Sequence, residues 1–337
     1  MQLDQRIKAF VKLGLFFKKI SSVKHEDAVF NQVFLKNNFF TKDIICYSLS
    51  NFSKLLKKKT LEKWLSSYDL SKKRTYSILV ICAGNIPLVS FHDILCVLVT
   101  GNKLILKLSN KDNVLPFLVL NKLIEIQPKF SKKIISSNFN KTLKFDKVIS
   151  TGSNSSIKYF NYYFKKKPSI IRSNRSSVAV LSGKETSKEL KDLSSDIFRY
   201  FGLGCRNVTK LFITKGYNIK LLQQYFNEYL SNISNNYYYD NYVYNKAILK
   251  LNKVKFHDFK NILVLESNKL HPPISVLYFE YYNEISDINF DSDKVQCIVS
   301  NNYNQHPTIL FGQAQCPKLD DYVIKLIQSH FYCPKDF

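Results

Sequence analysis

The sequence predicts an α/β protein in which a doubly wound, mostly parallel sheet is followed by a second α/β domain. Two apolar runs, 77–83 and 103–108, have the composition of parallel strands that are buried on both faces. A helix-like segment at 91–99 lies between them, and a third short strand is expected at 147–150. Strands that alternate with helices in this way are typical of open sheets that bind nucleotides at the carboxyl ends of their strands.

Residues 1–70 precede the first strand, and apolar residues recur in them at helical spacing, so we expect a helical cover over the sheet. Residues 1–15 mix charged with apolar side chains and contain no small-residue cleavage site, which argues against a secretory signal peptide. No apolar run reaches the length of about eighteen residues that a membrane-spanning helix needs, so no membrane span is predicted.

The net charge of +24 is unusual, because 50 residues are Lys or Arg and only 26 are Asp or Glu. A basic protein of this kind can bind nucleic acid or another anionic surface. The lysines are scattered, however, and Lys, Asn, Ile, Phe and Tyr are abundant together, which is typical of an AT-rich genome. Compositional bias is the preferred explanation and a nucleic-acid partner is disfavoured, although a basic surface would still attract a phosphorylated cofactor.

The seven cysteines include no C-x-x-C pair, and the six histidines are dispersed along the chain. This pattern argues against a disulfide framework and against a zinc cluster, so no metal site is predicted. Unpaired cysteines are typical of a reducing compartment, and we expect a cytoplasmic protein.

Small residues follow the predicted strands. Gly84 and Asn85 follow the first strand, and Ser109 follows the second as the expected N-cap of a helix that runs to about residue 126. Gly152 and Ser153 follow the third strand and precede a helix at 155–164. Free backbone N–H groups at a helix N-terminus suit a phosphate or the nicotinamide half of a dinucleotide. The usual G-x-G-x-x-G fingerprint is absent, and a plain turn at 151–153 is the alternative.

Cys205 is the most conspicuous residue of the second half of the chain. It follows a bend that contains Gly202 and Gly204 and precedes a strand expected at 209–213. Glycine permits positive φ and close approach of a ligand, and a cysteine on such a loop can be an exposed nucleophile. A buried structural thiol is the alternative. The other elements expected in this half are strands at 178–181, 262–265, 274–282 and 295–299, helices at 187–200 and 320–328, a low-complexity surface region at 230–245 and a loop at 311–317.

Three motifs stand in a fixed order: Gly84-Asn85-Ile86-Pro87-Leu88, then Gly101-Asn102 with Lys107-Leu108-Ser109, then the Cys205 loop. In this order the sequence resembles the acyl-CoA reductase branch of the aldehyde dehydrogenase superfamily, which includes the long-chain fatty acyl-CoA reductases of bioluminescence. The resemblance covers about residues 75–215. It implies an aldehyde-dehydrogenase-like fold with a helical cover at 1–70, an NADP(H)-binding domain at 71–182, a catalytic domain at 183–310 and a segment at 311–337 that packs back.

The resemblance also implies roles for particular residues. Cys205 matches the nucleophile, which would form a covalent thioester. The side chain of Asn85 would form an oxyanion hole with the backbone N–H of Cys205. Lys107 and Ser109 match positions that contact the adenosine ribose, and a lysine there tolerates a 2′-phosphate, which favours NADPH with NADH as the alternative. Gly152 and Ser153 match the turn against the pyrophosphate and nicotinamide side.

One departure from the family pattern bears on the reaction. Hydrolytic members carry a glutamate that activates water, and the matching segment here, 172–176, contains no carboxylate. Slow deacylation by water favours reduction of an acyl thioester such as acyl-CoA to an aldehyde over oxidation to an acid. Two alternatives stay open: a reductase of an acyl phosphate or another activated carboxyl group, and a non-catalytic nucleic-acid-binding or scaffold protein. A homo-oligomer is also left open.

Overall fold

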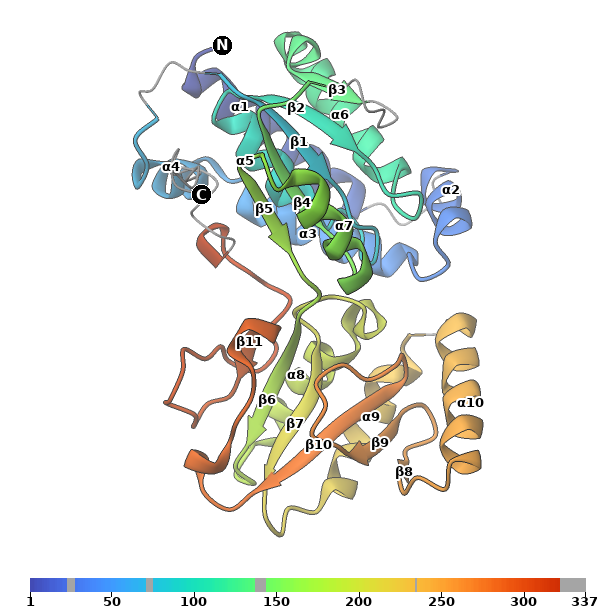
Figure 1. Cartoon of the computed structure of the whole chain (residues 1–337). Helices are drawn as coiled ribbons and strands as arrows, with labels where there is room; N and C mark the ends of the chain where they lie inside the picture. Colours follow the sequence, from blue (N-terminus) through green and yellow to red (C-terminus); the bar gives the residue numbers. More distant parts are fainter. Residues whose placement is uncertain (23–27, 71–74, 137–143, 234, 322–337) are drawn as a thin grey trace. The chain divides into compact units, whose positions relative to one another are not determined.

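The computed structural model describes residues 1–22, 28–70, 75–136, 144–233 and 235–321. The chain forms two compact units, Met1–Asn174 with Lys318–Phe337 and Arg175–Pro317, and each contains a mostly parallel sheet with helices (Figure 1). The predicted α/β fold class is therefore confirmed. Cys333 and most of the helix expected at 320–328 lie outside the described residues.

The division between the units differs from the domain boundary expected between residues 182 and 183. β6 (Ser176–Leu181) pairs with β7 (Val208–Thr214) and with β11 (Val295–Val299), so the strand expected to close the first domain is part of the second sheet. The C-terminal segment expected at 311–337 is also divided between the units, because residues 311–317 belong to the second unit and residues 318–321 to the first. In the first unit, Nε2 of His92 lies 3.1 Å from the carbonyl oxygen of Leu319.

The sheet of the first unit is parallel throughout, with the strand order β3-β2-β1-β4-β5. At its carboxyl end, Ile81 of β1 is paired with Lys107 of β2 on one side and with Ser150 of β4 on the other. The chain therefore leaves three neighbouring strands at one edge, which is where doubly wound sheets bind ligands. The strands are β1 (Ser77–Ile81), β2 (Lys103–Lys107), β3 (Ile134–Ser136), β4 (Lys147–Thr151) and β5 (Ser169–Arg172).

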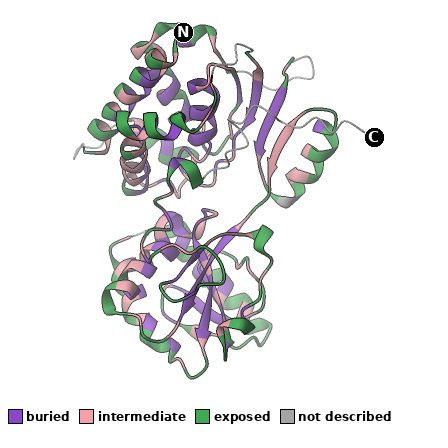
Figure 2. Ribbon diagram, turned by 90° about the vertical axis from the view of Figure 1, so that its left-hand side faces the viewer, coloured by how far each residue is buried: buried purple, intermediate pink, exposed green. Residues whose placement is uncertain are grey.

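Helices cover both faces of this sheet, and Figure 2 shows buried residues along the strands and on helix faces. One face packs on a large core to which the helices from α1 to α6 contribute, including Phe10, Phe17 and Phe91. The other face packs against Phe164 of α7. The helices are α1 (Leu3–Ser21), α2 (Ala28–Lys36), α3 (Lys42–Leu55), α4 (Lys58–Ser66), α5 (Phe91–Val99), α6 (Val114–Ile126), the 3₁₀ turn η1 (Pro128–Lys132) and α7 (Asn154–Phe164).

The sheet of the second unit has the strand order β11-β6-β7-β10-β9-β8, and its described pairs are parallel except β8 with β9. Cys205 lies three residues before Val208, the first residue of the central strand β7, so it lies at the amino edge of this sheet. The remaining elements are α8 (Ser187–Phe198), η2 (Arg199–Gly202), η3 (Ile219–Leu221), α9 (Leu222–Ser231), α10 (Asn236–Leu251), β8 (His257–Asp258), β9 (Leu263–Glu266), β10 (Val276–Tyr282), η4 (Ile285–Asp287) and η5 (Ser292–Lys294), with η6 (Leu319–Asp321) in the first unit.

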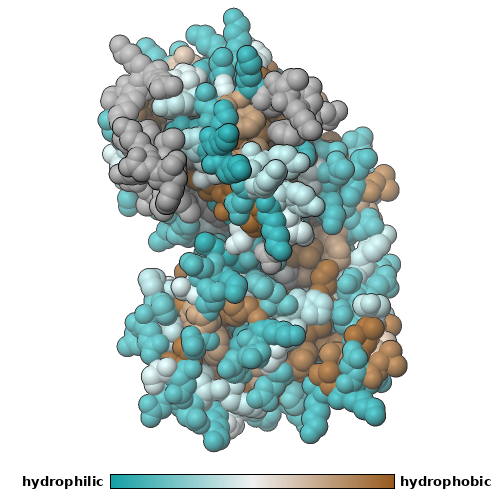
Figure 3. Space-filling model, in the orientation of Figure 1, coloured by the Kyte–Doolittle hydropathy of each residue, from teal (hydrophilic) through white to brown (hydrophobic). Residues whose placement is uncertain are grey.

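The low-complexity region at 230–245 is largely helical, because α10 begins at Asn236. Its Tyr238, Tyr242 and Asn245 are buried at intervals of four and three residues, so packing on one face stabilises a helix that composition alone does not predict. The prediction that this region lies at the surface holds for other side chains of α10, and Figure 3 shows apolar residues exposed on this helix. None of the helices in the described part of the chain is long and apolar enough to span a membrane.

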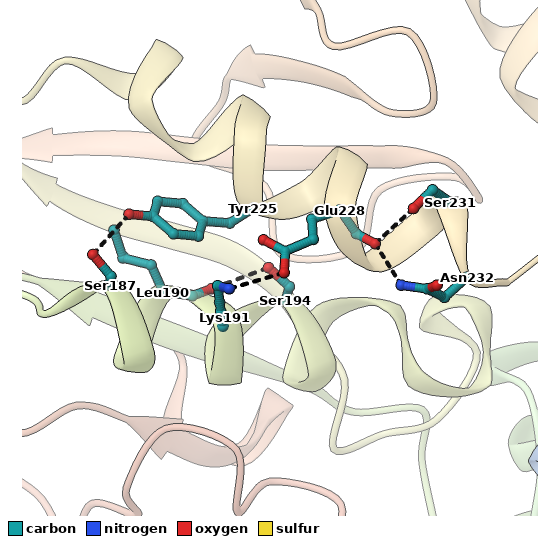
Figure 4. Close-up of polar contacts among 8 residues, drawn as sticks. All are labelled: Ser187, Leu190, Lys191, Ser194, Tyr225, Glu228, Ser231 and Asn232. Carbon is teal, nitrogen blue, oxygen red and sulfur yellow. Dashed lines mark hydrogen bonds and ion pairs between the residues drawn. The ribbon is translucent and has the colours of Figure 1, made fainter.

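Helix α8 leads into the Cys205 loop and is fastened to α9 (Figure 4). Nζ of Lys191 lies 2.8 Å from a carboxylate oxygen of Glu228, and the hydroxyl of Tyr225 donates to Oγ of Ser187 at 3.2 Å. Beneath these polar contacts, the ring of Phe198 packs edge-on against a ring of α9. The end of α8 is therefore held in a fixed place before the chain turns toward Cys205.

Candidate active site

Asn85 lies in the loop between β1 and α5, and its side chain is half-buried. Two outer contacts hold this loop. Nδ2 of Asn37 donates to the carbonyl oxygen of Gly84 at 3.2 Å, and Oγ of Ser48 donates to the carbonyl oxygen of Pro87 at 3.0 Å. The backbone on both sides of Asn85 is therefore anchored to the helical layer of the first unit.

Lys107 and Ser109 lie at the end of β2, with Lys107 exposed and Ser109 half-buried. The expectation that Ser109 caps the next helix is wrong. Its Oγ accepts from the backbone N–H of Lys111 at 3.2 Å, and its carbonyl oxygen accepts from the backbone N–H of Asp112 at 3.2 Å. These bonds form a turn, so helix α6 begins only after Asn113.

The loops that follow β1 and β2 touch each other. A Cβ placed on Gly84 would lie 2.4 Å from Oγ of Ser109, so any larger residue there would force the turn to shift. Asp112, which the sequence does not single out, is buried with 4% of its surface exposed, and its Oδ2 accepts from the backbone N–H of Leu88 at 2.8 Å. Burial raises the pKa of Asp112 from 3.8 to about 7.

Gly152 and Ser153 lie between β4 and α7. Oγ of Ser153 accepts from the backbone N–H of Ser156 at 3.4 Å, so Ser153 is the N-cap of this helix of 11 residues. A Cβ on Gly152 would lie 3.0 Å from the ring of Phe160 and 3.0 Å from Cβ of Ser156. The turn is thus kept free of side chain at the positive end of a helix, which is a favourable place for an anion.

Cys205 lies in a loop with a rare backbone conformation. Tyr200 and Phe201, at φ 57° and 54°, are left-handed, and Gly202 follows with φ 75°. Non-glycine residues adopt this conformation at a cost of about 1–2 kcal/mol each, and such strain concentrates at functional sites. The carbonyl oxygen of Cys205 accepts from Oγ of Ser177 at 3.1 Å, and Cys205 itself is partly exposed.

Asn207 holds this loop together, and the sequence does not single it out. Its side chain is fully buried, and Oδ1 accepts from the backbone N–H of Gly204 at 2.8 Å. Its Nδ2 donates to the carbonyl oxygens of Asp196, Ile197 and Arg199 at 3.1, 3.0 and 2.5 Å. One amide therefore joins the end of α8 to the residue before Cys205. In the sequence, the only sign of this role is that an asparagine stands two residues after Cys205. The hydrogen-bond partners of Asn207 are visible only in the fold.

Buried charges lie next to this loop in the chain. Nε of Arg206 donates to the carbonyl oxygen of Ala314 at 2.5 Å, while the carboxylate of Asp196 accepts from the backbone N–H groups of Gly312 and Ala314 at 2.6 and 3.0 Å. Burial raises the pKa of Asp196 to about 7, against the opposing effects of these bonds and of Arg206. The segment after β11 is thus fastened to the residues that carry Cys205.

A second thiol, Cys297, lies 3.0 Å from Oγ of Ser177, the same hydroxyl that bonds to the backbone of Cys205. Burial raises the pKa of Cys297, so it stays a neutral and weakly nucleophilic thiol.

The structure brings five of the predicted site residues to one edge of the first sheet and places Cys205 in the second unit. The five are Asn85, Lys107, Ser109, Gly152 and Ser153, which lie at or just after the carboxyl ends of three neighbouring parallel strands. The arrangement offers an amide donor, a cation, a hydroxyl and a helix N-terminus in the first unit, and a thiol on a strained loop in the second.

Comparison with known proteins points to one family and one fold. The family model described as acyl-CoA reductase (LuxC) matches residues 37–260. No curated protein sequence matches the chain. Each of three similar solved structures covers 85% of this chain. The first is aldehyde dehydrogenase 21 from Physcomitrella patens in complex with the reaction product succinate, with 11% identity, 70% of that chain covered and a TM-score of 0.62. The second is an NAD-dependent benzaldehyde dehydrogenase from Corynebacterium glutamicum, with 9% identity, 73% of that chain covered and a TM-score of 0.64. The third is the glyceraldehyde-3-phosphate dehydrogenase GapN from Methanocaldococcus jannaschii complexed with NADP, with 12% identity, 73% of that chain covered and a TM-score of 0.63. At these identities the structures share the fold.

Proposed function

The chain belongs to the acyl-CoA reductase (LuxC) family, and we propose that it reduces an acyl thioester to an aldehyde with NADPH through a covalent thioester on Cys205. Membership makes the chain an oxidoreductase with acyl-reductase chemistry on an aldehyde dehydrogenase fold. This favours the enzymatic hypotheses over a non-catalytic nucleic-acid-binding protein. A cytoplasmic location and a homo-oligomer stay predictions.

The conformation of the Cys205 loop is the observation that carries the proposal. Burial alone does not distinguish this thiol, because Cys46 and Cys297 are also partly exposed and Cys316 is exposed. Only the Cys205 loop, among loops with a cysteine in the described residues, contains two consecutive left-handed non-glycine residues. A strained loop held by a buried amide is the expected support for a nucleophile that must be placed accurately.

The residues at the edge of the first sheet fit a nicotinamide dinucleotide. The glycine turn at 152 and the N-terminus of α7 would accept the pyrophosphate, since backbone N–H groups and the helix dipole both favour an anion there. Lys107 and Ser109 would hold the adenosine ribose. Because Lys107 is exposed and cationic, it supports NADPH over NADH. The similar structures include an NAD-dependent benzaldehyde dehydrogenase and a glyceraldehyde-3-phosphate dehydrogenase complexed with NADP, so the fold itself accommodates both cofactors.

In the proposed reaction, the Cys205 thiolate attacks the acyl carbonyl carbon, and the coenzyme A thiolate leaves. The Asn85 amide and the backbone N–H of Cys205 would donate to the oxyanion, and one such donor contributes about 3 kcal/mol. NADPH, when bound, would supply the hydride that converts the Cys205 thioester to the alkoxide of a hemithioacetal. This oxyanion then re-forms the carbonyl group, and Cys205 leaves as a thiolate, which releases the aldehyde.

The absence of a carboxylate from segment 172–176 supports reduction over hydrolysis. Water attacks a thioester slowly unless a general base takes its proton, and general-base catalysis contributes about 10²–10⁴-fold. An acyl group on Cys205 would therefore persist until it receives a hydride.

The test is mass spectrometry of the protein after incubation with acyl-CoA in the absence of NADPH, followed by addition of NADPH. We expect one acyl adduct on Cys205, its loss on reduction, and a matching fall in NADPH absorbance. Cys205→Ala should abolish both signals, whereas Cys297→Ala, a control that removes another partly exposed thiol of the same unit, should keep them. An adduct that forms only from acyl phosphate would favour the alternative substrate, and no adduct from either donor would refute the enzymatic proposal.

A further inference from the structure

The turn at 107–112 contacts both ends of the loop that carries Asn85. At one end, Gly84 packs so closely on Ser109 that an added Cβ would lie 2.4 Å from the hydroxyl oxygen and 2.8 Å from Cβ. At the other end, the carboxyl group of Asp112 accepts from the backbone N–H of Leu88. Asn85 lies between these two contacts, so its position depends on a turn that belongs to a different strand.

We propose that Asp112 is a positioning residue that fixes the Asn85 loop to the turn carrying Lys107 and Ser109. The inference rests on the proposed function, because it takes Asn85 as the oxyanion donor and the turn as part of the cofactor site. Asp112 reaches the reacting atoms only through other residues. Its loss should therefore disturb two separable properties, acylation of Cys205 and binding of NADPH.

The geometry at Leu88 explains why this loop needs a fixed partner. Leu88 is buried and has φ 56°, a conformation that costs a non-glycine residue about 1–2 kcal/mol. Pro87, just before it, supplies no N–H to the loop, and its carbonyl oxygen is already bonded to Ser48. Two backbone hydrogen bonds hold the strained residue in place: the N–H of Leu88 donates to Asp112 at 2.8 Å, and the carbonyl oxygen of Leu88 accepts from the N–H of Phe91 at 2.8 Å. Of these two bonds, the one to Asp112 joins Leu88 to the turn after β2.

The buried carboxyl group of Asp112 is only partly satisfied by hydrogen bonds. Its second oxygen, Oδ1, is buried without a hydrogen-bond partner in the described structure. A buried polar atom without a partner destabilises a fold, and such atoms in native proteins call for a specific explanation. An asparagine could accept the same bond from Leu88 without a buried acid, which makes it the informative substitution.

The experiment compares Asp112→Ala and Asp112→Asn with a matched control, Asp146→Ala. Oδ2 of Asp146 accepts from the backbone N–H of Ser77 at 2.7 Å, which is the same type of bond at the opposite end of β1. Three quantities are measured on each full-length protein: the rate of Cys205 acylation by acyl-CoA without NADPH, NADPH affinity by fluorescence titration, and hydrogen exchange of the Leu88 amide.

For Asp112→Ala we expect acylation to slow by about 10- to 100-fold, as displacement of a positioned group by about 1 Å does. NADPH should bind about tenfold more weakly, and the Leu88 amide should exchange faster. Asp112→Asn should stay within about threefold of the wild type in all three measurements, because its side-chain oxygen still accepts the bond from Leu88. Asp146→Ala should leave both acylation and NADPH binding unchanged.

Two results would overturn the proposal: acylation and NADPH affinity of Asp112→Ala that match those of Asp146→Ala, or an Asp112→Asn variant as impaired as Asp112→Ala. If Asp112→Ala does not fold, Asp112→Leu replaces it, since leucine fills the buried space without an acceptor and should show the same losses. A wild-type protein that is never acylated would refute the proposed function instead. In that case NADPH affinity and Leu88 exchange still decide the role of Asp112.

Discussion

Replacement of Asn207 by alanine should release the Cys205 loop from the end of α8. The amide of Asn207 accepts one hydrogen bond from Gly204 and donates toward three carbonyl oxygens. Because an amide has only two protons, the three donor contacts amount to about two bonds, and the total is about three. At about 1 kcal/mol net for each bond, Asn207→Ala should lower the free energy of unfolding by about 3 kcal/mol.

Asn207→Asp is the matched control for this prediction. It keeps an oxygen that can accept from Gly204 but directs a second oxygen at the carbonyl groups of Asp196 and Ile197, where the wild type has a donor. Repulsion and the burial of a charge should make it at least as destabilising as alanine. Denaturant titrations give the free energies, and the rate at which iodoacetamide alkylates Cys205 reports on the loop itself.

We expect Asn207→Ala to change the alkylation rate of Cys205 while that of Cys316, which is exposed in the same unit, stays the same. A changed alkylation rate at Cys205 with an unchanged rate at Cys316 would distinguish a local effect on the Cys205 loop from destabilisation of the whole unit. The reasoning fails if Asn207→Ala unfolds within about 1 kcal/mol of the wild type, since that is the contribution of a single bond.

Two further predictions concern the turn after β2. Gly84→Ala places a Cβ 2.8 Å from Cβ of Ser109, so the turn must shift. We expect this shift to lower the free energy of unfolding by about 1–3 kcal/mol and to weaken NADPH binding, which fluorescence titration measures. An unchanged affinity for NADPH would contradict this prediction. The raised pKa of Asp112, from 3.8 to about 7, means that the folded protein keeps a proton which the unfolded chain releases, so the free energy of unfolding falls as pH rises from about 4 to 7. Three pKa units correspond to at most about 4 kcal/mol. Denaturant titrations of the wild type and of Asp112→Asn at several pH values should show this loss in the wild type only, and the comparison cancels the contribution of Asp196, which both proteins share. If the two free energies of unfolding change in parallel with pH, the raised pKa of Asp112 is excluded.

The main strands and the loops at the edge of the first sheet could be predicted because each apolar run ends where small polar residues begin. The runs at 77–83 and 103–108 correspond to β1 and β2, and the helix between them has the predicted bounds, Phe91–Val99. Parallel strands bring their carboxyl ends to one edge, so the proximity of Asn85, Ser109 and Ser153 follows from strand order. Their chemical roles come from the family resemblance and stay predictions.

Other features depend on contacts that a local pattern does not contain. The edge strands β3 and β5 are only 3 and 4 residues long, too short for a clear apolar period. Helix α10 is rich in Asn and Tyr, which are weak helix formers, and burial of Tyr238 and Tyr242 overrides that preference. Asp112 is separated from Leu88 by 24 residues, so nothing near either residue in the sequence marks the bond.

The glycines before Cys205 account for only part of the bend. Gly202 is left-handed, as a glycine-rich turn predicts, but the bend begins two residues earlier at Tyr200 and Phe201. These two residues cost about 2–4 kcal/mol together. The bonds of Asn207 contribute about 3 kcal/mol, which is close to the same amount. The bonds of Asn207 therefore offset about as much free energy as the strain costs, beside the packing of the buried Phe201 ring on Tyr238 and the bond from the backbone N–H of Leu203 to the carbonyl oxygen of Tyr200. Loss of the amide should let the backbone relax toward ordinary angles. Since Cys205 is two residues from Asn207, relaxation would move the nucleophile, and the alkylation rate of its thiol is the direct measure of that movement.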